Sequence, residues 1–145
     1  EAKKKLKFPI SYVHSNLYEA DYERFKSNSW LSSECINFYF QILGEKYNKA
    51  TVGCSITLMD PHVTHLFYFS MILKSIGNLG NVDLTADYIF IPINDSDSFD
   101  IPMCGTHWAL LVYDKRQNKF FYYDSLGILM NNAILIAKKI NALIN

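Results

Sequence analysis

The spacing of apolar residues predicts two helices in the first half of the chain. Residues 29–43 place apolar side chains on a wide helical face, with Ser32 or Ser33 as a possible N-cap and Gly44 as the expected end. A second helix is predicted over residues 60–74, because an aspartate suited to an N-cap is followed by proline at the first helical position.

The second half changes to a strand pattern and then returns to a helix. Residues 88–94 are β-branched and aromatic, and residues 107–113 and 119–125 form two further apolar runs joined by the polar turn 114–118. Residues 131–145 again show helical periodicity, with the lysines expected to face away from the core. The stripe expected to be buried consists of Ala133, Ile136, Ala137, Ile140, Leu143 and Ile144.

This order of elements predicts an α+β fold, in which helices pack on a mostly antiparallel central sheet. Residues 1–145 suit one domain, since no linker-like stretch divides them. The loop 95–105 is long enough to suggest a functional role.

Composition limits the classes of partner and the compartment. Fourteen basic residues balance fourteen acidic ones, so bulk charge does not favour nucleic acid. No apolar run reaches the roughly 18–20 residues of a membrane helix, and no signal peptide is recognisable. Three cysteines, Cys35, Cys54 and Cys104, lack paired spacing, which favours a reducing, intracellular location in cytoplasm or nucleus. Because the first residue is glutamate, we expect the natural start to be missing.

The hairpin of residues 107–113 and 119–125 brings a histidine and an aspartate together. If its turn is centred within residues 114–118, His107 and Asp124 lie nearly opposite one another, about 4.5–5.5 Å apart at Cβ. A carboxylate there can fix the imidazole tautomer, as the third member of a catalytic triad does. The alternative is an ordinary surface pair, and a register shift of one residue would separate the two groups.

Several segments resemble the ubiquitin-like-specific protease family, the sentrin or SUMO cysteine peptidases. "GTHWALLVY" followed by "FFYYDS" resembles the His-Trp and Tyr-Asp-Ser blocks of that family, and "LYEADYERFKSNSWLSSECINFYF" resembles its entrance segment. "LMDPHVTHLF" and "YIFIPINDS" lie between them in the expected order. Among family members, the spacing is most similar to the deneddylase branch.

The resemblance implies a papain-like or adenain-like cysteine protease fold and a ubiquitin-like modifier, of Nedd or SUMO type, as partner. A thiolate would attack the carbonyl after the modifier's terminal Gly-Gly, with His107 as general base and Asp124 orienting it. Trp30 and Trp108 match the indoles that line the family's Gly-Gly tunnel. The residues implied to contact the substrate are Trp30, Trp108, Asp21, Leu31, Gly105 and Thr106.

The family's nucleophile and oxyanion glutamine belong to a later Asp-Cys-Gly block, whereas no cysteine follows Asp124 in this chain. We therefore expect a carboxy-terminally truncated, inactive chain; Cys104 is a remote substitute nucleophile. A non-catalytic modifier-binding module and an acyltransferase of the same clan are the alternatives.

The chain also departs from the family at "WLSS", where Trp-Leu-Asn-Asp is frequent, so Asp21 or Glu34 would have to supply the acidic contact. His62 and His65 could share a metal on one helix, but no further ligand is suitably spaced, and no metal or cofactor is expected.

Overall fold

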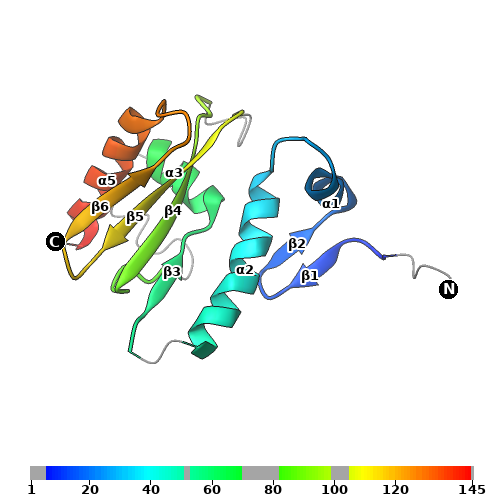
Figure 1. The fold of residues 1–145 in the computed structure, drawn as a ribbon, viewed down its shortest axis with the longest axis horizontal. Helices are drawn as coiled ribbons and strands as arrows, with labels where there is room; N and C mark the ends of the chain where they lie inside the picture. Colours follow the sequence, from blue (N-terminus) through cyan, green and yellow to red (C-terminus); the bar gives the residue numbers. More distant parts are fainter. Residues whose placement is uncertain (1–5, 51–52, 70–81, 99–104, 145) are drawn as a thin grey trace.

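The computed structural model describes residues 6–50, 53–69, 82–98 and 105–144, and has the predicted α+β architecture (Figure 1). Its strands are β1 (Ile10–Tyr12), β2 (Ser15–Leu17), β3 (Ile56–Leu58), β4 (Tyr88–Asn94), β5 (Trp108–Asp114) and β6 (Lys119–Tyr123). Its helices are α1 (Glu19–Lys26), α2 (Ser33–Ala50), α3 (Pro61–Phe69) and α5 (Met130–Ile144). Parts of three predicted segments lie outside the described residues: 70–74, 99–104, which includes Cys104, and residue 145.

A four-stranded sheet in the order β3-β4-β5-β6 organises the fold. β4, β5 and β6 pair antiparallel, whereas β3 pairs parallel with β4 through Ile56 opposite Tyr88. The prediction of a mostly antiparallel sheet is thus confirmed. β3 was not predicted, because three residues are too few to show a strand period.

The main core lies between one face of this sheet and the helices α3 and α5. Alternate residues of β4 (Ile89, Ile91 and Ile93) are buried against Ile136 and Ile140 of α5. The predicted stripe of the last helix is therefore confirmed at its centre. The expectation that its lysines face away is wrong for Lys139, whose ammonium donates to two carbonyls in the last turn of α3, those of Phe67 and Tyr68, at 2.7 and 2.6 Å. A cation satisfies helix-terminal carbonyls well.

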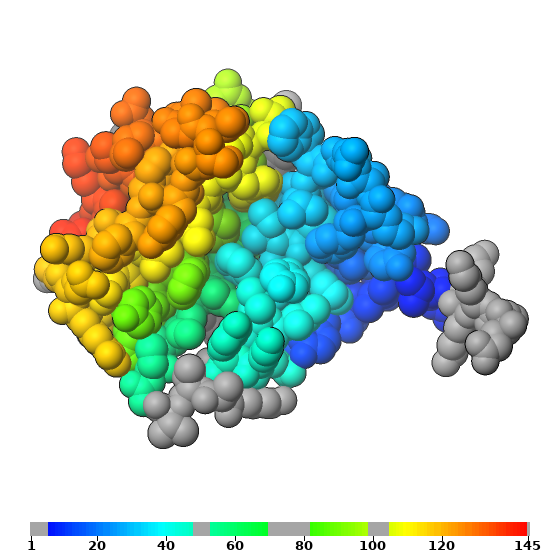
Figure 2. Space-filling model, in the orientation of Figure 1, coloured from blue at the N-terminus to red at the C-terminus, as the bar shows by residue number. Residues whose placement is uncertain are grey.

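Helix α2 packs between the β1–β2 hairpin and β3. In Figure 2, the cyan surface of α2 lies between the blue N-terminal segment and the green segment that follows α2. Ser32 caps it, since its Oγ accepts the N–H of Cys35 at 3.2 Å. The prediction that Gly44 ends this helix is wrong, because α2 continues to Ala50. Packing on two sides stabilises the helix beyond the weak helical propensity of one glycine.

Candidate active site

The site lies at the open end of the β5–β6 hairpin, whose register differs from the predicted one by two residues. The prediction placed His107 directly opposite Asp124, and that register would pair Phe121 with Leu110. In the structure, Phe121 pairs with Val112. The turn is centred later because Asn118 adopts a left-handed conformation (φ 50°) and its N–H donates to the carbonyl of Lys115. A shift of two residues, unlike a shift of one, keeps every side chain on its original face.

The predicted contact between His107 and Asp124 is confirmed. Nε2 of the imidazole lies 2.5 Å from Oδ1 of the carboxylate. The two side chains are 10% and 1% exposed, so water has little access to the pair. Burial strengthens such a charge-assisted hydrogen bond relative to a surface pair.

Four groups donate hydrogen bonds to the Asp124 carboxylate. Oδ1 accepts from His107 and from the N–H of Leu126 at 2.9 Å; Oδ2 accepts from the Tyr122 hydroxyl and from the N–H of Leu129 at 3.1 Å. Burial raises the pKa of Asp124, but the hydrogen bonds from Tyr122, His107 and the two backbone N–H groups outweigh burial and hold the pKa well below its ordinary value. Asp124 is therefore an anion at neutral pH.

This ionisation state fixes the histidine tautomer. A carboxylate can only accept hydrogen bonds, so Nε2 of His107 must carry the proton that it shares with Asp124. Nδ1 is then the ring nitrogen that can accept a proton. Among the described residues, Nδ1 has no hydrogen-bond partner. The pair has the chemistry of an oriented general base.

The two tryptophans come from separate parts of the chain, Trp30 from the segment before α2 and Trp108 from β5. Trp108 is the first residue of β5, and its indole Nε1 donates to the carbonyl of Leu31 at 2.9 Å. Trp30 is 64% exposed, and its carbonyl accepts from Arg24 at 2.7 Å. β5 thus holds the segment before α2 next to the histidine. That Trp30, Leu31 and Trp108 contact a substrate stays a prediction.

The two acidic candidates, Asp21 in α1 and Glu34 in the first turn of α2, have partners within the protein. The carboxylate of Asp21 is largely buried and accepts from the Ser32 hydroxyl at 2.7 Å. Glu34 lies 3.3 Å from Nε2 of His62. That Asp21 contacts a substrate stays a prediction. In the structure, its hydrogen bond to Ser32 holds the residue that caps α2. Cys35, the residue whose N–H bonds Ser32, is fully buried.

Sequence reasoning did not single out Asn94 and Asp95, which the structure places beside His107. The carboxylate of Asp95 accepts hydrogen bonds from the predicted substrate contact Thr106 and from the backbone of His107. Burial raises the pKa of Asp95, but the bonds from His107 and Thr106 keep it below its ordinary value. Asn and Asp at the end of a strand often bond nearby backbone, and this was the available signal.

Other kinds of site find little support in the described part of the chain. No group of three or more His, Cys, Asp and Glu residues there has the arrangement of a metal site. His62 instead bonds Asp60, at 2.8 Å. None of the helices in the same residues has both the length and the apolar character required to cross a bilayer.

Comparisons with known proteins agree with this geometry. Residues 78–144 match the Ulp1 protease family, C-terminal catalytic domain. Over 142 residues the chain is 32% identical to the probable sentrin-specific protease 8 of Dictyostelium discoideum, covering 94% of this chain and 58% of the relative. It is 32% identical over 126 residues to human sentrin-specific protease 8, covering 80% and 54%. With NEDD8-specific protease 1 of Arabidopsis thaliana the identity is 28% over 119 residues, covering 80% and 50%.

The chain spans about half the length of these curated relatives. The match to the family includes β4, the histidine–aspartate hairpin and all of α5. Family match, relatives and site geometry lead to one conclusion: the chain belongs to the Ulp1 protease family, in the branch of sentrin-specific protease 8.

Proposed function

We propose that residues 1–145 contribute to the catalytic domain of a cysteine peptidase that cleaves after the terminal Gly-Gly of a ubiquitin-like modifier. Such an enzyme would process modifier precursors and release modifiers from their conjugates. The observation that supports this most directly is the buried contact of His107 Nε2 with Asp124 Oδ1 at 2.5 Å. An ordinary surface pair would not have an aspartate with four donors and a nearly inaccessible side chain.

In the proposed reaction, His107 Nδ1 takes the proton of a cysteine thiol supplied by chain beyond these 145 residues. The thiolate adds to the carbonyl carbon of the last glycine, and the imidazolium returns the proton to the departing amine. Water, activated by the same Nδ1, then hydrolyses the thioester. Asp124 stays ionised throughout and stabilises the imidazolium through Nε2.

The substrate end would be held by the exposed indole of Trp30 and by Trp108. The Trp30 side chain is 64% exposed, so its indole is accessible to a substrate. Flat rings close to the backbone leave room for glycine and exclude larger side chains. A Nedd-type modifier is our first choice, because two relatives are named as NEDD8-specific proteases; a SUMO-type modifier is the second.

The test uses the full-length protein that carries these residues. It is mixed with NEDD8, SUMO and ubiquitin, each bearing a C-terminal thiol-reactive electrophile. We expect a covalent adduct with NEDD8, detected by mass spectrometry, and none with a NEDD8 probe whose Gly-Gly is replaced by Ala-Ala. His107→Ala is the matched enzyme control and should slow adduct formation severely.

Three outcomes would contradict the proposal. Tight binding of an unreactive modifier without any adduct would indicate a non-catalytic binding module. Acyl transfer from an acyl-coenzyme donor to an amine would indicate an acyltransferase. An adduct that forms equally fast in His107→Ala would exclude this histidine as the general base.

A further inference from the structure

Asp95 follows β4 directly, and its carboxylate binds the two residues that precede Trp108. Oδ1 accepts the backbone N–H of Thr106 at 2.6 Å and that of His107 at 2.9 Å, while Oδ2 accepts the Thr106 hydroxyl at 3.0 Å. In the opposite direction, the N–H of Asp95 donates to the carbonyl of His107 at 3.3 Å. Asp95 therefore bonds both the N–H and the carbonyl of His107.

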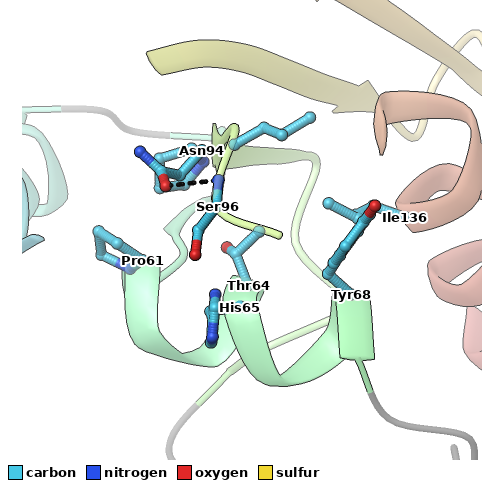
Figure 3. A pocket seen from close by; sticks show the side chains of 9 residues that line it. Pro61, Thr64, His65, Tyr68, Asn94, Ser96 and Ile136 are labelled. Atoms are coloured by element: carbon cyan, nitrogen blue, oxygen red, sulfur yellow. Dashed lines mark hydrogen bonds between the residues drawn. The ribbon is translucent and has the colours of Figure 1, made fainter. Parts of the chain in front are cut away.

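Asn94 adds a second donor to the same carbonyl, through Nδ2 at 3.1 Å. Its own side chain is fixed because Oδ1 accepts the N–H of the buried Ser96 at 2.9 Å, the dashed line in Figure 3. The β4–β5 ladder ends at the pair of Asn94 with Trp108, so His107 lies one residue outside it. Its position thus depends on these bonds beyond the ladder.

The approach of the two segments is close. A Cβ at Gly105 would lie 2.0 Å from Oδ1 of Asn94 and 2.2 Å from Oδ1 of Asp95. Only a residue without a side chain permits this approach. The packing therefore leaves the backbone before His107 little freedom to move.

We propose that Asp95 is a positioning residue for catalysis, which fixes the backbone of His107 so that its imidazole meets Asp124 and faces the nucleophile. This inference rests on the proposed function. Asp95 acts through His107 and need not touch substrate. Its action is geometric, because both backbone N–H groups converge on the single atom Oδ1.

If the role of Asp95 is geometric, two conservative variants should differ in kcat. Asp95→Asn removes the charge but keeps a carbonyl oxygen at Oδ1, and its amide can donate to the Thr106 hydroxyl. Asp95→Glu keeps the charge but moves the carboxylate by one methylene, on the order of 1 Å, a displacement that can reduce turnover about 10²-fold. We expect Asp95→Asn to have nearly wild-type kcat and Asp95→Glu to lose about 10–100-fold.

The experiment measures kcat and KM of both full-length variants on a NEDD8 substrate with a C-terminal fluorophore. KM should stay near the wild-type value, because the tail-binding indoles are unchanged. If Asp95→Glu does not fold, Asp95→Ala replaces it with the same expected loss. The proposal is overturned if Asp95→Asn, correctly folded, loses as much kcat as Asp95→Glu, or if the Glu or Ala variant is fully active.

A spectroscopic measurement separates this inference from the proposed function. In the wild-type protein, the proton shared by His107 Nε2 and Asp124 should give a low-field NMR resonance. We expect Asp95→Asn to retain it and Asp95→Glu or Asp95→Ala to broaden or shift it. If the full-length protein acts on none of the modifiers, the proposed function is refuted, but the NMR resonance can still be measured. If the resonance is unchanged in the Glu or Ala variant, the inference about Asp95 is refuted.

Discussion

Replacement of Gly105 by alanine adds one methyl group at the most crowded point next to His107. The new Cβ would lie 2.0 Å from Oδ1 of Asn94 and 2.2 Å from Oδ1 of Asp95, whereas such contacts are essentially never below 3.0 Å. The atoms must therefore separate by at least about 1 Å. Neither side chain can rotate away freely, since Asn94 bonds Ser96 and the His107 carbonyl, and Asp95 bonds the His107 N–H.

Two magnitudes follow from this displacement. Overpacking of a tight site reduces the free energy of unfolding by about 1–3 kcal/mol. A shift of about 1 Å in a catalytic group reduces kcat about 10²-fold, provided that His107 moves with its backbone. We therefore expect a folded Gly105→Ala protein that is modestly destabilised and about 100-fold slower.

Urea unfolding and fluorogenic NEDD8 cleavage by the full-length protein measure the two effects. Gly44→Ala is the matched control, because a Cβ there has no neighbour within 4 Å. That control lies within α2 and should stabilise the protein by about 0.5–1 kcal/mol at unchanged kcat. If Gly105→Ala has both the kcat and the stability of wild type, the close approach of the loop to β4 is wrong.

Three further predictions concern the pair itself, the core and the start of α3. Asp124→Asn should lower kcat about 10⁴-fold, because an amide permits the wrong imidazole tautomer; a fully active variant in the cleavage assay would remove Asp124 from the mechanism. Ile91→Ala should lower the free energy of unfolding, measured in urea, by about 2–5 kcal/mol, since Ile91 is completely buried. A variant with wild-type stability would contradict the burial of Ile91 in the core. The Asp60 hydrogen bond raises the pKa of His62 more than burial lowers it, and the charges of Asp60 and Glu34 raise it further. A raised folded-state pKa gives stability that is present below the unfolded value of about 6.5 and is lost as pH rises through the folded one. The stability difference between wild type and His62→Gln should thus be larger at pH 5 than at pH 9, and a difference independent of pH would contradict the ion pairs.

The amino-acid sequence by itself determined the elements whose partners are close in the chain. The β5–β6 hairpin has a turn of a few residues, so the contact of His107 with Asp124 could be predicted from spacing alone. The buried stripe of α5 likewise follows from periodicity, because it depends on one helix and one apolar surface. The family resemblance rested on the same local segments.

The tertiary structure alone decided the features that depend on distant partners. β3 becomes a strand because β4, thirty-two residues later, supplies its hydrogen bonds, and α2 passes Gly44 because neighbours pack on two sides of it. Asp95 faces His107 only when β4 and β5 pair, and Asp21 meets Ser32 only when α1 packs on α2. Local periodicity reports which face of one element is apolar; it carries no information on which polar groups another segment will bring within hydrogen-bond distance.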